Sequence, residues 1–106
     1  MKILFDQGTP VPLRKALAEH SVETAFERGW QTLENGELLA KAESGHYEIL
    51  ITTDQNLRYQ QDLSERHIAI VVLLSTSWPR ISKHTETIRK IVSETLPGDY
   101  HEIKIP

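Results

Sequence analysis

Short runs of consecutive apolar residues alternate along the chain with segments that have helical spacing. Residues 1–5 and 47–53 are nearly all apolar, and residues 68–74 form the most apolar run of the sequence. Runs of this length without a polar face are typical of strands that are covered on both sides, as in a parallel sheet. We therefore expect three buried strands, with 68–74 in a central position.

The segments between these runs carry the signals of helices. Pro10 and Pro12 open a first helix to about residue 20, because proline fits the first helical turn. A second helix from about residue 35 ends near Gly45, a residue type common just past helix ends. The other expected elements are a short strand at 21–26, helices at 54–65 and 81–96, a loop at 75–79 and an edge strand at 101–105.

Strands and helices thus alternate from the first residue to the last. Such alternation indicates a parallel sheet with helices on both faces. We expect a three-layer α/β/α sandwich with a mostly parallel central sheet of about five strands. A chain of 106 residues with 39% hydrophobic content fits a single globular domain, residues 1–106.

The composition excludes several classes of protein. No run approaches the roughly 18–20 apolar residues of a membrane span, and the start of the chain lacks the apolar stretch of a secretion signal. The absence of cysteine excludes thiol catalysis and thiolate zinc sites. We therefore expect a cytoplasmic protein without a membrane partner, of the size of a single monomer, which could also form a homo-oligomer.

Charge is distributed unevenly along the chain. The net charge of -3 argues against strong non-specific binding of nucleic acid through charge alone. Residues 1–57 carry five Lys and Arg against nine Asp and Glu, whereas residues 58–90 carry six against three. An acidic and a basic part of the chain could therefore meet in one cleft.

Two predicted strands end in an aspartate at the same edge of the sheet, Asp6 after residues 1–5 and Asp54 after residues 47–53. Ligands of open parallel sheets bind beyond this edge. If the two strands are neighbours, the carboxylates face one crevice and suit a hard cation such as Mg²⁺. Glu37, near the start of the second helix, is a third candidate. Each acid also has a structural interpretation, as a helix cap, a turn residue or a partner of the helix dipole.

The order of these residues resembles a known family. The segment 1–6, followed by Thr9 and Pro10, and the segment 49–54 resemble the small PIN-like proteins, relatives of PIN domains that are often the toxin half of toxin–antitoxin pairs. That family opens with an apolar strand and Asp-Glu-Asn, and a second apolar strand ends in Thr, a variable residue and Asp. An acid near a helix start lies between them, as Glu37 does here. The resemblance covers roughly residues 1–80.

The resemblance implies a PIN-like fold and metal-dependent hydrolysis of RNA, single-stranded by expectation. Asp6, Glu37 and Asp54 would be the catalytic and metal-binding acids, with Mg²⁺ or Mn²⁺ as cofactor and an antitoxin protein as partner. The chain departs from the pattern at Gln7, where the family has a second acid, and at Gly8, where it has Asn. A neutral Gln7 implies weaker metal binding or an inactive site.

Further residues suit contacts with nucleic acid. Arg80 and Lys83 could contact phosphates, and Trp78 could stack on a base; Arg58, just after Asp54, is a further candidate. The structural alternative is that Trp78 packs beneath its loop while the cations lie in solvent. The five histidines show no paired spacing typical of metal ligands.

Two other functions remain open. One is a PIN-like module that binds RNA or a protein without cutting, which Gln7 makes credible. The other is a signalling receiver domain, in which an aspartate accepts a phosphoryl group. Such a domain uses aspartates after its first and third strands, a hydroxyl after the fourth and a lysine near the fifth. In this chain these would be Asp6, Asp54, Ser75 or Thr76, and Lys104. Only one acid follows the first strand, however, whereas a receiver usually has two.

Overall fold

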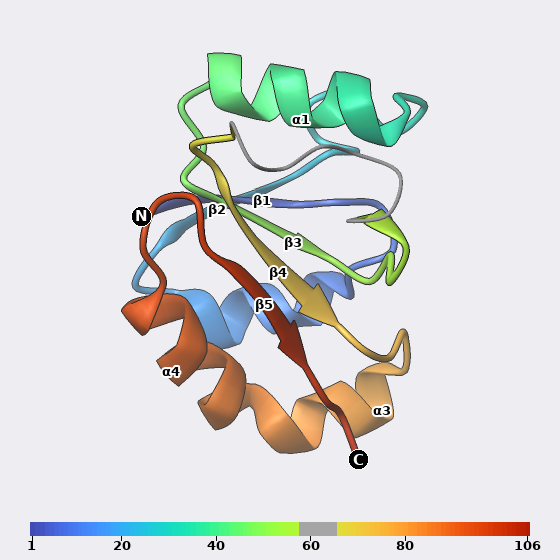
Figure 1. Cartoon of the computed structure of the whole chain (residues 1–106). Coiled ribbons are helices and arrows are strands. Elements are labelled where there is room, and N and C mark those ends of the chain that lie inside the picture. The colour runs from blue at the N-terminus through green and yellow to red at the C-terminus, as the bar shows by residue number, and fades with distance from the viewer. Residues whose placement is uncertain (58–65) are drawn as a thin grey trace.

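Five short strands form one sheet in the middle layer of the molecule. The computed structural model describes residues 1–57 and 66–106, and within them the strand order is β2-β1-β3-β4-β5. All neighbouring strands are parallel. Figure 1 shows the sheet between α1 on one side and α3 and α4 on the other, so the expected three-layer α/β/α fold is confirmed. The elements are β1 Lys2–Phe5, η1 Val11–Leu17, β2 Ser21–Thr24, α1 Asn35–Ser44, β3 Ile49–Thr52, β4 Ala69–Leu73, α3 Trp78–Ile81, η2 Ser82–His84, α4 Thr85–Glu94 and β5 Tyr100–Ile103.

The most apolar run of the sequence forms β4, an interior strand. All five of its residues are buried, and it pairs with β3 on one side and β5 on the other. β1 and β3 are neighbours, in the register Leu4↔Leu50 and Phe5↔Ile51. The predicted buried strands therefore form the interior of the sheet, and the edges are β2 and β5.

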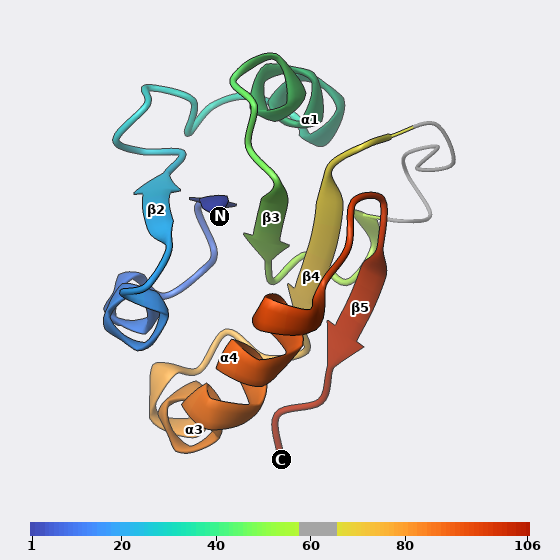
Figure 2. The ribbon, with the colours of Figure 1, turned by 90° about the vertical axis from the view of Figure 1, so that its left-hand side faces the viewer.

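Successive residues of a strand face opposite layers, because side chains alternate across a sheet. Phe5 of β1 packs in a core cluster with Leu17 of η1 and Val92 of α4. The preceding Leu4 packs in a second cluster with Leu39 of α1. Figures 1 and 2 show η1, α3 and α4 together on one side of the sheet, with α1 alone on the other.

The first two predicted helices lie where the sequence placed them. η1 is a 3-10 helix that begins after Pro10, with Pro12 in its first turn. α1 ends at Ser44, and Gly45 is its C-cap, as expected. Within the described ranges, no helix is both long and apolar enough to cross a membrane.

The region after β4 differs from the prediction. The predicted loop at 75–79 is wrong at its end, because α3 already begins at Trp78. Ser77 caps this helix, since its hydroxyl accepts the backbone N–H of Arg80 at 3.4 Å. The single helix predicted at 81–96 is divided into α3, η2 and α4. The Ser82 hydroxyl donates to the Pro79 carbonyl at 2.9 Å at this break. Most of the predicted helix at 54–65 lies outside the described residues.

Candidate functional site

The carboxyl ends of β1 and β3 mark the point where the strand order reverses. The chain passes from β1 to β2 on one side and later returns to β3 on the other side. Ligands of open parallel sheets bind in the crevice at such a point. Asp6 directly follows β1, and Asp54 follows β3 by two residues. β1 and β3 are neighbours, which was the condition for a shared crevice, so the two aspartates lie at one edge of the sheet.

Three groups hold the carboxylate of Asp6. The backbone N–H of Gly8 donates to its Oδ1 at 3.1 Å. The Thr9 hydroxyl lies 3.1 Å from the same oxygen and 2.8 Å from the carbonyl oxygen of Ile51, so one proton is shared between two acceptors. The Thr52 hydroxyl donates to Oδ2. Asp6 is therefore fixed both by its own turn and by the neighbouring strand.

Thr52 links the two aspartates. It is the last residue of β3 and only 1% exposed. Its hydroxyl donates to Asp6 and accepts the backbone N–H of Asp54, with 3.0 Å between N and Oγ1. A hydroxyl can do both, because it has one proton and two lone pairs. This side chain therefore determines how the two acidic residues are placed relative to each other.

Asp54 is held from two other directions. Its Oδ1 accepts the backbone N–H of Asn56 at 2.9 Å, a contact of the kind that the structural interpretation of this aspartate as a helix cap predicts. Its Oδ2 accepts from the side-chain Nδ2 of Asn35 at 2.8 Å. Asn35 is the first residue of α1, so the beginning of that helix reaches the crevice. Figure 1 shows this end of α1 on the same side as the loop after β3.

Gly8 allows the turn after β1 to approach the loop after β3. A Cβ atom at Gly8 would overlap Oγ1 of Thr53, far inside van der Waals contact. The glycine that departs from the PIN-like pattern therefore gives room to the Thr53 side chain, which would have to shift for any larger residue at this position. Gln7, the other departure, is exposed beside the crevice.

The electrostatic surroundings oppose ionisation of Asp6. Burial raises the pKa of its carboxyl above the ordinary value, and the negative charge of nearby Asp54 adds a smaller rise. Hydrogen bonds from Thr52, Thr9 and Gly8 lower the pKa and partly offset burial. A cation between the two carboxylates would remove this mutual repulsion.

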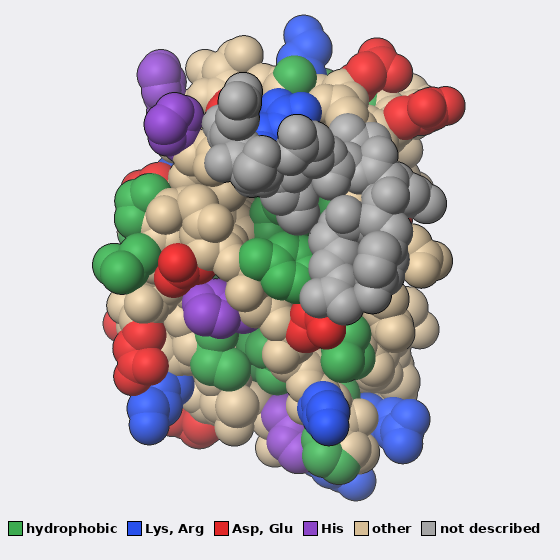
Figure 3. Space-filling view, viewed as in Figure 1, with side chains coloured by type: hydrophobic (Ala, Val, Ile, Leu, Met, Phe, Trp, Pro, Cys, Tyr) green, Lys and Arg blue, Asp and Glu red, His purple; other side chains and the backbone are tan. Residues whose placement is uncertain are grey.

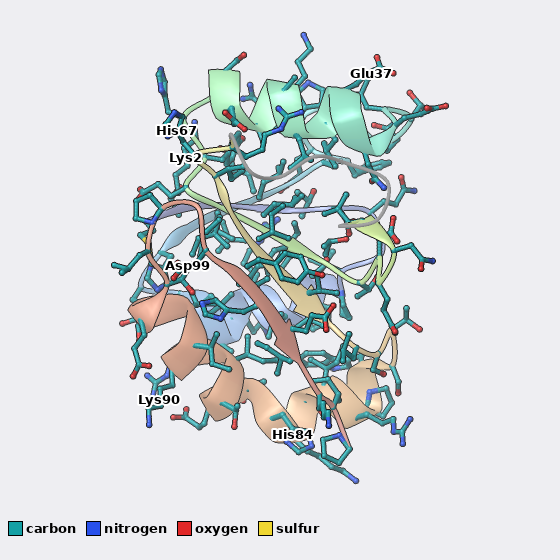
Figure 4. All side chains as sticks on the ribbon, viewed as in Figure 1. Lys2, Glu37, His67, His84, Lys90 and Asp99 are labelled. Carbon is teal, nitrogen blue, oxygen red and sulfur yellow. The ribbon has the colours of Figure 1, made fainter. Side chains whose placement is uncertain are left out.

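Glu37, the third expected acid, lies apart from this pair. α1 buries Leu38 and Leu39 toward the sheet, which leaves Glu37 on the exposed side of the helix. Figure 4 shows its side chain at the outer surface of α1, directed away from the sheet. Accordingly, the described part of the chain contains no group of three or more His, Cys, Asp or Glu arranged to hold a metal ion.

The remaining pair still fits a hard divalent cation. A carboxylate has about four acceptor positions. Three donors occupy positions on Asp6, and two occupy positions on Asp54. Counting donors from the described residues alone, each aspartate keeps at least one acceptor position for a ligand. Mg²⁺ commonly uses one or two carboxylates and keeps several waters, so this donor set is small but sufficient.

The two aspartates could be identified from the sequence, but the role of the polar residues that orient them, Thr9, Thr52 and Asn35, could not. Thr52 gives the clearest signal, as a polar residue that ends an otherwise apolar strand. Once Phe5 is paired with Ile51, it also lies opposite Asp6. For Asn35 we find no sequence signal, because its contact depends on where α1 begins.

The residues proposed to contact nucleic acid lie on and around α3. Trp78 is half-buried and packs against the core cluster under η1 and α4, as its structural alternative required. Arg80 and Lys83 are exposed. Arg58 lies outside the described residues.

Of the residues considered for a receiver domain, Thr76 and Lys104 are exposed, and Ser75 accepts the backbone N–H of Ser77 at 3.0 Å.

No protein-family model, curated protein or solved structure matches this chain. Its function is therefore inferred from the geometry of the crevice and from the chemistry of the residues that line it.

Proposed function

We propose that the chain is a metal-dependent ribonuclease of the PIN-like class, with the crevice between β1 and β3 as its active site. One observation carries the proposal: Asp6 and Asp54 lie together at the strand-order reversal, held in place by the shared hydroxyl of Thr52. Two carboxylates at this point suit Mg²⁺ or Mn²⁺, and a metal ion placed there suits a phosphodiester.

Each residue of the crevice has a separate role. Asp6 and Asp54 hold the cation, and Thr52 and Asn35 orient their carboxylates. When bound, Mg²⁺ or Mn²⁺ would activate a water molecule and stabilise the leaving oxygen. Gln7 contributes no charge, so we expect weaker metal affinity than for a site with a third acid. Glu37 is exposed and directed away from the sheet, so it is not among the ligands in this arrangement.

The test is cleavage of single-stranded RNA by purified protein with Mn²⁺, with Mg²⁺ and with a chelator. We expect metal-dependent cleavage that Asp54→Asn abolishes, because Asn keeps the turn but loses the charge. Glu37→Gln is the matched control and should cleave within about twofold of wild type. Equal cleavage by wild type and Asp54→Asn would show that the activity comes from elsewhere.

The second candidate is a PIN-like module that binds RNA or a protein without cutting. The observation in its favour is that three donors already occupy Asp6, while Gln7 adds no charge. Absence of cleavage by wild type and by Gln7→Glu, together with RNA binding, would favour this module over the ribonuclease.

The toxin role is part of the same proposal and has its own test. A ribonuclease toxin should arrest growth when produced alone, and a neighbouring gene should encode a protein that restores growth. We expect arrest by wild type and none by Asp54→Asn at equal protein levels. Arrest by both variants would contradict a role for the crevice.

A further inference from the structure

We propose that the hydroxyl of Thr53 is a further substrate contact in the crevice, where it donates a hydrogen bond to a phosphate oxygen of the bound RNA. Thr53 lies in the chain between Thr52 and Asp54. The inference rests on the proposed function for its substrate class. It adds which neutral side chain recognises the anionic group of that substrate.

Gly8 indicates where this hydroxyl lies. A Cβ atom at Gly8 would overlap Oγ1 of Thr53 and would lie 3.8 Å from Oδ1 of Asp6. The hydroxyl and the carboxylate therefore both lie within 4 Å of one point, beside the turn after β1. Because Gly8 has no side chain, this residue leaves the hydroxyl uncovered.

The distance between the two oxygens suits a ligand shared by a metal ion and Thr53. They are separated by roughly 6 Å at most, a span that one metal-bound ligand can bridge, since a Mg²⁺–oxygen bond is about 2.1 Å and an O–H···O hydrogen bond about 2.8 Å. A phosphate oxygen bound to an ion on Asp6 can therefore also accept the proton of Thr53.

The proton of this hydroxyl is available, unlike those of the other threonines in the crevice. The Thr9 hydroxyl lies against Asp6 and a backbone carbonyl, and the Thr52 hydroxyl donates to Asp6. Within the part of the chain that the structure describes, the Thr53 hydroxyl has no hydrogen-bond partner. Thr53 is half-buried, so its hydroxyl can reach a ligand from a supported position.

The charge around the crevice makes a neutral donor important. None of the described residues that we place in the crevice is basic. Figure 3 shows acidic side chains over the beginning of α1, which borders the crevice, and Lys and Arg side chains over α3 and α4, on the other side of the sheet. A phosphate that approaches two carboxylates is therefore bound by the metal ion and by neutral donors, and threonine hydroxyls commonly contact phosphates.

Gln7 is the alternative neutral donor at this edge. It is exposed, and its long side chain loses much rotational freedom when it is fixed on a ligand. Thr53 has a β-branched side chain with few rotamers, so fixing its hydroxyl costs less entropy. We therefore assign the phosphate contact to Thr53.

The experiment is a calorimetric titration of a 5′-mononucleotide into full-length protein in excess Mn²⁺. This probe carries a phosphate but no phosphodiester, so it binds without being cut. We expect Thr53→Val to weaken binding about tenfold or more, because a hydrogen bond to a charged group is lost. Thr53→Ser keeps the hydroxyl and should bind within about twofold of wild type. Thr87→Val, at an exposed threonine of α4, is the matched control.

A titration with Mn²⁺ alone separates a direct contact from an effect on the acids. We expect Thr53→Val to bind Mn²⁺ within about twofold of wild type, because Thr53 holds neither aspartate. A loss of Mn²⁺ affinity as large as the loss of nucleotide affinity would overturn the proposal, since Thr53 would then act by positioning the metal ligands.

Gly8→Ala gives an independent test of the position of the hydroxyl. The added methyl group forces the Thr53 side chain to shift but stays at ordinary contact distance from Asp6, 3.8 Å from its Oδ1. We expect Gly8→Ala to weaken nucleotide binding in wild type and to have no further effect in Thr53→Ala, where the displaced atom is absent. Equal losses in both backgrounds would contradict the placement of the hydroxyl.

Unchanged nucleotide binding by Thr53→Val, or no nucleotide binding by wild type in excess Mn²⁺, would also overturn the proposal. The failure of the proposed function is a separate result. Nucleotide binding that depends on Thr53, without RNA cleavage by wild type, would keep the contact and remove the ribonuclease. Metal-dependent cleavage that is unchanged in Thr53→Val, with unchanged nucleotide affinity, would do the reverse.

Discussion

At the scale of single residues, the candidate site depends on Thr52 as much as on the acids. Its hydroxyl is buried, donates to Asp6 and accepts from the backbone of Asp54. The acids could be predicted from the sequence, because each follows an apolar strand. Their shared partner could not, because the register that places Thr52 opposite Asp6 is a property of the folded sheet.

Thr52→Val tests this role, since valine has the same shape without the hydroxyl. We expect a loss of about 1–3 kcal/mol in the free energy of unfolding, because a carboxylate oxygen and a backbone N–H lose their partner. Denaturant unfolding measures it. Thr52→Ser keeps the hydroxyl and should lose less; unchanged stability of Thr52→Val would contradict the role of the hydroxyl.

Asp6→Asn tests the cost of burying a charge. Because burial raises the pKa of Asp6, the folded protein holds this proton more tightly than the unfolded chain does. Wild-type stability therefore falls as the pH rises from the ordinary carboxyl pKa through the raised one, whereas the amide of the variant does not titrate and has no such loss. In thermal melts without divalent ions, the stability of the variant relative to that of wild type should increase as the pH rises from about 4 toward neutrality. A constant or opposite difference would contradict the pKa shift.

At the scale of elements, the apolar runs predicted the strands well, whereas the bounds of the helices after β4 could not be predicted. The run that became β4 could hardly be anything but an interior strand, since it has no polar face. The early start of α3 is accompanied by the cap that Ser77 provides, and the division of the predicted helix at 81–96 by the hydrogen bond from Ser82 to the Pro79 carbonyl. Such local competition between side chain and backbone has little effect on the hydrophobic pattern.

The end of α1 shows how backbone geometry can depart from residue preference. His46 has a φ of 62°, and its N–H donates to Glu43 O at 3.0 Å, while the N–H of Tyr47 donates to Ala42 O at 3.0 Å. This is the Schellman arrangement, in which glycine usually takes the left-handed position. Gly45, one residue earlier, is the C-cap with an ordinary φ.

His46→Gly should therefore stabilise the protein by about 1 kcal/mol, because glycine adopts a positive φ without steric cost. For a chain of this size that corresponds to a rise of about 4–8 °C in the thermal midpoint. Calorimetry at neutral pH checks it, with His67→Gly, an exposed histidine, as the matched control. An unchanged or lower midpoint for His46→Gly would mean that the histidine ring makes compensating contacts.

At the scale of the whole molecule, the fold could be predicted from the alternation of strands and helices. The candidate site could be predicted only in part. A parallel sheet brings Asp6 and Asp54 to one edge whatever the details, so the pair was predictable. Glu37 was expected with them because it lies near the start of α1. The helix instead presents Asn35 to the crevice and turns Glu37 to solvent, a rotation fixed by which face packs on the sheet.

Asp6 and Asp54 should form one divalent-cation site without Glu37, and the proposed chemistry depends on that site. Calorimetric titration with Mn²⁺ of wild type, Asp54→Asn and Glu37→Gln measures it, with the fold of each variant checked by thermal unfolding. We expect one bound ion in wild type, at least roughly tenfold weaker binding by Asp54→Asn, and Glu37→Gln within about twofold of wild type, since one or two carboxylates suffice for such an ion. Binding by Asp54→Asn equal to wild type, or loss of binding in Glu37→Gln, would contradict the two-aspartate site.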